Sequence, residues 1–257
     1  VGNIRVGGVL VPSRLYRIRE GLSMKRAPFF WLVPAALFLV TCDNGPTGPD
    51  EVLFSDDFSG HPNGSFPDSW EQFDELLHGD SPRGLWTVQD SKLHQANDTW
   101  GGYDDPDWYY QEGTVLLAGS ETWTDYRFTV DVTPEVTGGV AVYVRVTEEN
   151  NRLEYYRVYV TDDEAYGGPF WRLDHRGGLA YTVLVRNRSA GYIPGQTFRV
   201  IIEVTGNLVR VYHGNLGNLM LEWDGGADYP HCHTGRIALM AFRNPGVTFD
   251  NILVEQL

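Results

Sequence analysis

From residue 51 onwards, apolar and polar residues alternate with a period of two, the pattern of strands with one buried face. No segment after residue 41 has the 3.6-residue spacing of an amphipathic helix. The 29 glycines and 14 prolines interrupt the alternating runs and mark turns. The pattern therefore predicts an all-β chain. The clearest runs are residues 126–132, 139–146, 152–161, 180–187, 198–204, 208–213, 235–242 and 247–254.

The turns between these runs indicate how the strands pair. Glu149-Asn150-Asn151 and Thr205-Gly206-Asn207 each separate two alternating runs as hairpin connections, and Gly177-Gly178 separates another two. About twelve to fourteen short strands without a long polar linker fit one antiparallel two-sheet sandwich or jelly roll. We therefore expect a single domain over residues 51–257.

A basic and apolar segment precedes this domain. Lys25-Arg26 is followed by an uncharged run of 14 residues, 27–40, which is shorter than the roughly 20 that a membrane-spanning helix needs. This pattern predicts a signal peptide over residues 24–41. The sequence Leu39-Val40-Thr41-Cys42 resembles the lipobox of bacterial lipoproteins, which implies cleavage before Cys42 and attachment of lipid to this residue. An ordinary secretory signal or a membrane-tethered apolar segment is the alternative.

The predicted signal peptide indicates what the segments before and after it are. Residues 1–23 are expected to be a non-native upstream extension, because a signal peptide begins with its basic region. Residues 42–50 are rich in glycine, proline and polar residues and are expected to form a flexible tether. Cys232 is then the one cysteine left beside a lipidated Cys42, so no intrachain disulfide is expected.

The charge of the chain limits its partners. Removing residues 1–41 takes away six basic residues and one acidic residue, which moves the net charge from −14 to −19. Such a charge disfavours nucleic acid and the surface of an anionic bilayer. We therefore expect attachment to the membrane through the N-terminal lipid only, and a location in the bacterial cell envelope, facing the periplasm or the cell surface.

A series of short motifs, in the expected order, covers nearly the whole domain and resembles the concanavalin A-like lectin/glucanase superfamily. Within that superfamily the chain is most similar to bacterial domains related to laminin G-like proteins and 3-keto-disaccharide hydrolases. The resemblance implies a jelly-roll sandwich, and it is more informative on fold than on activity. The segments that carry it are residues 53–58, 85–93, 138–140, 204–212, 235–239 and 247–252.

Alternation assigns the two faces of the central strands. Val140, Val142, Val144 and Val146 share one face, which we expect to lie in the core. If residues 139–146 pair with residues 152–161, aromatic and guanidinium side chains gather on the other face. Rings and fixed guanidinium groups suit the apolar C–H faces and the hydroxyl groups of sugars, so this face is a candidate glycan site. An outer face whose tyrosines are simply good strand formers is the alternative. The candidate residues are Tyr143, Arg145, Tyr155, Arg157 and Tyr159.

Residues 100–110 hold five aromatic residues and three carboxylates, an unusual content for a loop. Trp100, Tyr103 and Trp108 are expected to form a rim or lid of a binding site, with packing onto the end of the sandwich as the alternative. Trp171 and His175 are expected to extend the same surface. The remaining tryptophans in strand contexts, which are Trp70, Trp86, Trp123 and Trp223, are expected to pack in the core.

Carboxylates occur on the first and last predicted strands, Asp56 and Asp57 on one and Asp250 on the other. The ends of a jelly-roll chain commonly pair in one sheet, and the resemblance implies that such a site often holds structural Ca²⁺, which prefers oxygen ligands. Exposed carboxylates without a metal are the alternative. His231-Cys232-His233 places two imidazoles close together, but no third zinc or copper ligand is indicated.

No catalytic motif is evident. Laminarinase-type members of the superfamily carry Glu-x-Asp-x-x-Glu on one strand, whereas the single Glu-x-Asp here, Glu222-Trp223-Asp224, has Ala227 in the sixth position. We therefore expect a lipid-anchored, glycan-binding domain that is not an enzyme. A glycoside hydrolase or lyase of the same fold, acting on a di- or polysaccharide, is the first alternative. An envelope sandwich with a structural or protein-interaction role is the second.

Overall fold

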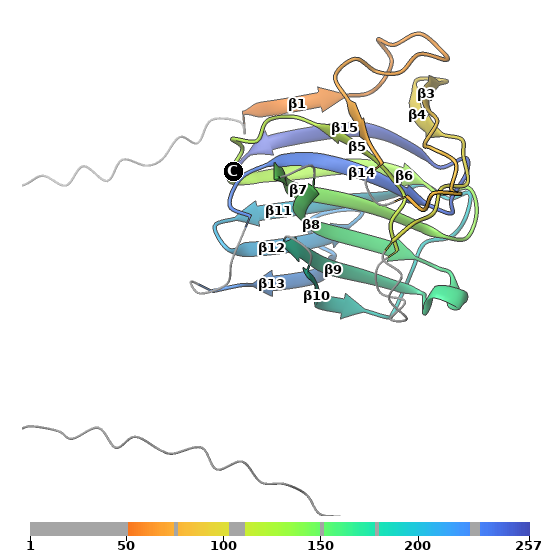
Figure 1. Ribbon diagram of the computed structural model, residues 1–257. Coiled ribbons are helices and arrows are strands. Elements are labelled where there is room, and N and C mark those ends of the chain that lie inside the picture. The colour runs from red at the N-terminus through yellow and green to blue at the C-terminus, as the bar shows by residue number, and fades with distance from the viewer. Residues whose placement is uncertain (1–50, 75–76, 103–110, 150–151, 178–179, 227–231) are drawn as a thin grey trace, which may run out of the picture. The chain divides into compact units, whose positions relative to one another are not determined.

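The computed structural model describes residues 51–257 except 75–76, 103–110, 150–151, 178–179 and 227–231. The predicted signal peptide, Cys42 and the tether lie outside these residues. Within the described part, the chain forms two antiparallel sheets and one short 3₁₀ helix, Glu164–Tyr166 (Figure 1). The predicted all-β, two-sheet antiparallel sandwich is confirmed.

The first sheet has eight strands in the order β13-β12-β11-β6-β15-β4-β3, with β1 paired to β15 beside this path. The first and last strands of the domain therefore pair, as expected. The bounds are β1 Val52–Asp56, β3 Trp86–Gln89, β4 Lys92–Gln95, β6 Tyr126–Thr133, β11 Phe198–Thr205, β12 Leu208–His213, β13 Leu219–Asp224 and β15 Thr248–Gln256.

The second sheet has seven strands in the order β10-β9-β8-β7-β14-β5-β2. Its longest pair, β7 with β8, extends to the register Glu149 opposite Arg152, as the predicted hairpin requires. In the first sheet, Thr205 lies opposite Leu208, and Gly206 in the turn between them has a φ of 55°. The bounds are β2 Glu71–Phe73, β5 Thr114–Ala118, β7 Gly139–Glu149, β8 Arg152–Thr161, β9 Phe170–Gly177, β10 Ala180–Asn187 and β14 Arg236–Phe242.

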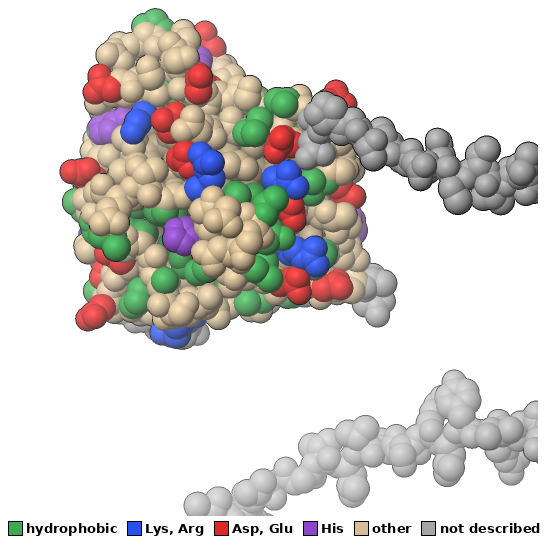
Figure 2. Space-filling model, turned by 180° about the vertical axis from the view of Figure 1, so that it is seen from behind, with side chains coloured by type: hydrophobic (Ala, Val, Ile, Leu, Met, Phe, Trp, Pro, Cys, Tyr) green, Lys and Arg blue, Asp and Glu red, His purple; other side chains and the backbone are tan. Residues whose placement is uncertain are grey.

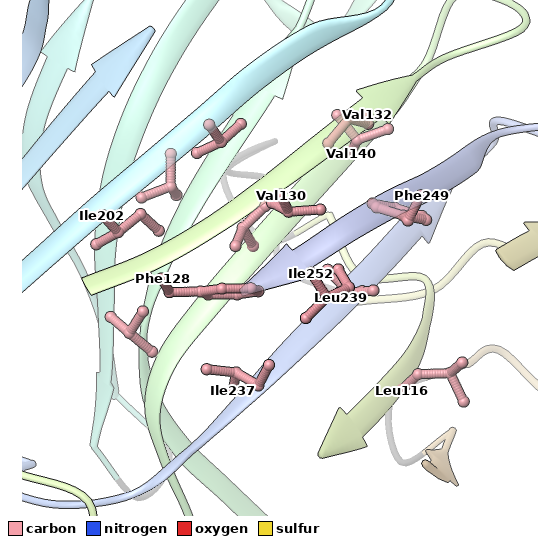
Figure 3. Packing of buried hydrophobic residues seen from close by; sticks show 14 of the residues in the cluster. Leu116, Phe128, Val130, Val132, Val140, Ile202, Ile237, Leu239, Phe249 and Ile252 are labelled. Carbon is pink, nitrogen blue, oxygen red and sulfur yellow. The ribbon is translucent and has the colours of Figure 1, made fainter. Parts of the chain in front are cut away.

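The space between the sheets is filled by the apolar side chains that alternation predicted. On β6, Tyr126, Phe128, Val130 and Val132 are buried, and every other residue is half-buried. Figure 3 shows Phe128 and Val130 packed near Val140 and Leu239 of the facing sheet. Trp70 and Trp86 are buried in this core, and Trp123 and Trp223 pack against it, as expected.

A β-bulge in β7 changes the predicted alternation. The register against β8 shifts between Val144 and Thr147, and Arg145 has a φ of 52°. Val140, Val142 and Val144 face the inter-sheet core, but Val146 lies in a second apolar cluster. The prediction for Val146 is wrong because the bulge adds one residue, so that side chains beyond it change faces.

The second cluster covers the outer face of the central strands of the seven-stranded sheet, which are therefore buried on both sides, whereas the edge strands β2 and β10 stay partly exposed. It contains Tyr143, Tyr155 and Tyr159 together with apolar residues from β5, β8, β9 and β14. Phe73 and Trp100 pack against it as partly buried side chains. The predicted open groove along β7 and β8 is wrong, because the chain covers this face of the sheet.

Candidate functional site

The predicted tyrosines and one of the predicted arginines meet around a buried carboxylate. Glu112 Oε1 accepts hydrogen bonds from Tyr155 Oη at 2.7 Å and from Arg157 Nη1 at 2.9 Å, and Glu112 Oε2 accepts one from Tyr143 Oη at 3.0 Å. All four residues are at most 2% exposed. We refer to these four residues with Tyr159, Arg172, Asp174 and Arg176 as the tyrosine–arginine cluster.

A second carboxylate, that of Asp174, neutralises the other side of Arg157. Its Oδ2 accepts from Arg157 Nη2 at 2.8 Å and from Arg157 Nε at 3.1 Å, and its Oδ1 lies 2.7 Å from Arg172 Nε. Burial by itself costs a charged group several kcal/mol, so such groups occur only with good partners. The paired charges therefore tie β8 to β9 and to the segment that carries Glu112.

Arginines and aromatic rings also stack across the cluster. The guanidinium carbon of Arg157 lies 5.2 Å from the centroid of the Tyr159 ring and 5.1 Å from that of Tyr181. Arg172 lies 5.2 Å from the Tyr159 ring, and Arg176 lies 6.0 Å from the Tyr155 ring. Each of these distances is within the range of a cation–π contact.

Burial determines the protonation states of the cluster. It raises the pKa of Tyr143 and of Tyr155 well above the ordinary value, and the Glu112 carboxylate adds to the effect. Both phenols therefore remain hydrogen-bond donors. Burial lowers the pKa of Arg157, but Glu112 and Asp174 outweigh it, so the net pKa is raised and the guanidinium is charged.

Partly exposed aromatic rings lie at the border of the cluster. Phe73 of β2, Tyr181 of β10 and Trp100 pack against it, and we call these three residues the aromatic rim. Trp100 stacks on His78 with ring centroids 4.9 Å apart. A cavity of about 10 Å³ lies between Phe73, Glu112, Tyr155 and Arg176, which is room for about one water molecule. The rim, rather than the buried tyrosines, is what a ligand outside the molecule meets.

The structure brings together only some of the residues predicted as a binding face. Tyr143, Tyr155, Arg157 and Tyr159 lie in the cluster, and Trp100 lies in the rim. Arg145 does not, because the bulge directs its guanidinium to the end of the sandwich, where Nη1 donates to the Gly206 carbonyl at 2.6 Å and Nη2 to Asp125 at 3.2 Å. Tyr103 and Trp108 lie outside the described residues.

The prediction for Trp171 and His175 placed them on the wrong face of the sheet. Trp171 is 1% exposed in the inter-sheet core, and the His175 ring lies 5.0 Å from that of Tyr156, a residue of the same core. On β9 the outer face is taken by Arg172, Asp174 and Arg176 instead. The error follows from the register, since Tyr156 pairs with His175 and shares its face.

Glu112, Asp174, Arg172 and Arg176 were not predicted as site residues. The three on β9 carried a signal, because Arg172, Asp174 and Arg176 recur with period two, which predicts a common face. Glu112 carried no such signal, because it lies outside the strands and forms an isolated bridge with Gly101. Only tertiary packing brings it to the tyrosines.

The residues predicted as calcium ligands lie near the junction of β1 and β15 on the other sheet. Asp56 Oδ1 accepts from the Phe58 amide at 2.9 Å and Oδ2 from Trp70 Nε1 at 3.0 Å. Asp250 Oδ1 accepts from the Asn251 amide at 2.7 Å. The described residues contain no group of three or more His, Cys, Asp and Glu side chains arranged to hold a metal, Asp56, Asp57 and Asp250 included. A structural Ca²⁺ stays a prediction.

Cys232 lies near His175, and Glu222 is paired with Arg210. The Cys232 thiol is buried, which raises its pKa to about 12, and its Sγ lies 3.9 Å from His175 Nε2. Glu222 forms an exposed ion pair with Arg210, with 2.7 Å between Oε2 and Nε. His231 lies outside the described residues. Among the residues described, no helix is long and apolar enough to span a bilayer.

Comparison with solved structures identifies the fold. The chain superposes on a protein of unknown function with a galectin-like fold from Bacillus subtilis with a TM-score of 0.56 and 16% identity, over 81% of this chain and 97% of that one. It superposes on the carbohydrate binding module CBM66 from Bacillus subtilis with a TM-score of 0.54 and 12% identity, over 73% and 96%.

A third structure is described by the words "Prominent members of the human gut microbiota express endo-acting O-glycanases to initiate mucin breakdown". It matches with a TM-score of 0.54 and 15% identity, over 80% of this chain and 100% of that one. No family model and no curated protein matches the sequence. At these identities the likeness shows the fold, a galectin-like jelly-roll sandwich.

Proposed function

We propose that this protein binds carbohydrate at the aromatic rim of the seven-stranded sheet and does not hydrolyse it. The observation that carries the proposal is the aromatic rim: Phe73, Trp100 and Tyr181 are partly exposed beside a fixed ionic network. Aromatic rings accept the apolar C–H face of a sugar. The structural likeness to a carbohydrate binding module supports the same function.

The ionic network supports binding by keeping the rim rigid. Tyr181 Oη and Tyr155 Oη form a hydrogen bond, and the Tyr181 ring lies against the guanidinium of Arg157. Because Arg157 is itself held by two carboxylates, the Tyr181 ring has little freedom to lose when a ligand binds. A preorganised ring lowers the entropic cost of association.

The same network supports a role without catalysis. The two carboxylates of the cluster, Glu112 and Asp174, are each bound to Arg157, and they are 2% and 1% exposed. Glycoside hydrolysis requires a carboxylic acid that protonates the leaving oxygen and a second carboxylate that faces the sugar. The exposed carboxylates of Glu71 and Glu148 on the same sheet are also ion-paired, both to Arg236, with nitrogen–oxygen distances of 2.9 and 3.9 Å.

We further propose that the domain acts in the bacterial envelope, held by a lipid at Cys42. The flexible tether of residues 42–50 would separate the sandwich from the membrane, and the acidic charge of the domain would keep it away from anionic headgroups. This arrangement leaves the rim free to meet glycans outside the cell or in the periplasm.

The test is a glycan array with the full chain, followed by calorimetric titration of the strongest hit. Trp100→Ala and Tyr181→Ala are expected to weaken binding about thirtyfold, the usual effect of removing an aromatic anchor. Phe66→Ala is the matched control, because Phe66 is 39% exposed and belongs to neither apolar cluster. Equal affinities for all three variants, or an array without hits, would contradict the site.

A second measurement separates binding from hydrolysis. The wild-type protein is incubated with each array hit, and the release of reducing sugar is followed. We expect no release above a buffer blank. Release above the blank by the wild-type protein would establish a hydrolase and contradict the proposal.

A further inference from the structure

The eight-stranded sheet forks where its last strand changes partners. Thr248 and Phe249 of β15 pair with β4, whereas Ile252 to Glu255 pair with β1. Between these two stretches the register of β15 against β6 shifts, and Asn251 has a φ of 52°. β-bulges of this kind redirect side chains next to binding sites.

A hollow of about 640 Å³ lies at this fork. Its volume is within the range of pockets that hold small ligands. Ile252 and Leu253 of β15 line it together with Thr129 of β6. The polar side chains that line it include Asp57, Ser59, His61, Arg199 and Asn251. Figure 2, the view from behind Figure 1, shows basic and acidic side chains next to one another on that side of the molecule.

The donors of the hollow are held in place by a carboxylate. Asp131 of β6 accepts two hydrogen bonds of 2.7 Å from Arg199 Nε and Nη2, and one of 3.0 Å from Asn251 Nδ2. Burial raises the pKa of Asp131, but these hydrogen bonds outweigh it, and the net pKa is below the ordinary value. Asp131 is therefore ionised at neutral pH and fixes a guanidinium and an amide side by side.

The acceptors are held in the same way. Asp57 Oδ1 accepts from the Ser59 amide at 3.0 Å and from Ser59 Oγ at 2.7 Å. Asp57 remains exposed, so its other oxygen faces solvent. His61 Nε2 lies 3.4 Å from Asp56 Oδ2, which orients the imidazole ring. The hollow thus presents carboxylate acceptors opposite guanidinium, amide and imidazole groups.

This combination matches vicinal hydroxyl groups, each of which donates one hydrogen bond and accepts others. Apart from the His61 ring, no aromatic side chain lines the hollow among the described residues, so stacking on a sugar face plays little part. We propose that the hollow is a second carbohydrate site, which binds one neutral sugar residue through its hydroxyl groups. The proposal extends carbohydrate binding to a surface that is independent of the aromatic rim.

The charge around the hollow favours a neutral sugar over an acidic one. Four carboxylates but only two basic side chains lie at or beside the hollow, so the local charge is negative and repels an anion. Of the described residues near the hollow, Asp56, Asp57, Asp131 and Asp250 are acidic, and Arg199 and Lys92 are basic. A uronate or a sulfated sugar would add to this repulsion.

The test is nuclear magnetic resonance on the ¹⁵N-labelled full chain in EDTA, which removes divalent metal. The probes are the methyl glycosides of glucose, galactose, mannose and fructose, with glucuronate as the charged control. We expect saturable shifts of the Ser59, Gly60 and Asn251 amides with at least one methyl glycoside, and none with glucuronate. If none of the four methyl glycosides shifts these amides, the proposal is overturned.

Two variants distinguish this site from the aromatic rim. Asp57→Asn and Asn251→Gly are expected to weaken the methyl glycoside at the hollow at least tenfold, and glycine keeps the positive φ of residue 251. Trp100→Ala is expected to leave that affinity unchanged. Binding at the hollow that is insensitive to both of its variants would overturn this proposal. Shifts confined to residues around Trp100 and Tyr181 would also overturn it, while supporting the aromatic rim.

Discussion

At the scale of single residues, Glu112 is a buried carboxylate that serves as the shared acceptor of three other buried side chains. Its carboxylate accepts hydrogen bonds from two buried phenols and one buried guanidinium. A buried polar group that loses its partner pays the full cost of desolvation. The stability of the outer face of the seven-stranded sheet therefore depends strongly on this residue.

We predict that Glu112→Ala lowers the free energy of unfolding by about 3–5 kcal/mol, because it leaves Arg157, Tyr143 and Tyr155 without their shared acceptor. Urea denaturation measures the loss. Glu222→Ala is the control, since the Glu222 and Arg210 side chains are 47% and 42% exposed and such pairs contribute about 0–1 kcal/mol. Equal losses for the two variants would mean that the cluster is not buried as described.

At the scale of elements, the bulges decide which side chains share a face. The bulge in β7 sends Arg145 to the end of the sandwich and Val146 to the second apolar cluster. The bulge in β15 coincides with the change of partner from β4 to β1 and with the hollow. Local departures from regular strand geometry thus decide which side chains leave the outer face of the seven-stranded sheet and where the hollow lies.

The approach of the Glu112 segment to β14 depends on a glycine. A Cβ added to Gly113 would lie 1.6 Å from the carbonyl oxygen of Ala241, which is backbone and cannot rotate away. We predict that Gly113→Ala costs at least about 1–3 kcal/mol of stability, because the segment must move away from the sheet. The same denaturation experiment measures it.

Gly79→Ala is the control for this glycine, because an added Cβ there meets no atom within 4 Å. It is expected to change stability by no more than about 0.5 kcal/mol. A Gly113→Ala variant as stable as the wild type would show that Glu112 reaches the cluster without this close approach.

At the scale of the whole molecule, the pairing of the chain ends places acidic residues together. Because the pKa of Asp250 is raised, its ionisation is unfavourable in the folded state. The cost is present above the folded-state pKa and vanishes below the ordinary value of 3.8. We predict that, in EDTA, Asp250→Asn raises the melting temperature at neutral pH, and that this gain disappears in acid. A stabilisation that is independent of pH would contradict the assignment.

With calcium bound, the charge of Asp250 is predicted to stabilise the folded state, whereas without metal it destabilises it. If Ca²⁺ binds near Asp56, Asp57 and Asp250, a hundredfold excess over the dissociation constant stabilises the folded state by about 2.7 kcal/mol. The melting temperature of the wild type is then expected to rise with calcium, and Asp250→Asn to remove the rise. Identical melts in EDTA and in millimolar calcium would end the calcium prediction.

The anchoring prediction concerns the mature chain as a whole. Intact-mass spectrometry of protein extracted from membranes is expected to find Cys42 as the first residue, with the added mass of acyl chains. Cys42→Ala is expected to be soluble or to stay unprocessed. A mature protein that begins at another residue, or that carries no acyl mass, would contradict the lipobox interpretation.

The sequence by itself determined the sandwich, because period-two alternation and turn residues are local properties of the chain. It predicted the strands β6, β7, β8, β10, β11, β12, β14 and β15 within a few residues, and it placed Val140, Val142 and Val144 in the core. It also grouped Tyr143, Tyr155, Arg157 and Tyr159 on one face, although the same alternation wrongly added Arg145 to them.

Only the tertiary structure decided what covers that face and which residues join it. Glu112 reaches the tyrosines from outside the strands, and the register of β8 against β9 turns Trp171 and His175 inward and Arg172, Asp174 and Arg176 outward. The bulges at Arg145 and Asn251 are equally invisible to alternation, because they depend on how neighbouring strands compete for hydrogen bonds. Pairing between distant segments, rather than local pattern, therefore set both candidate sites.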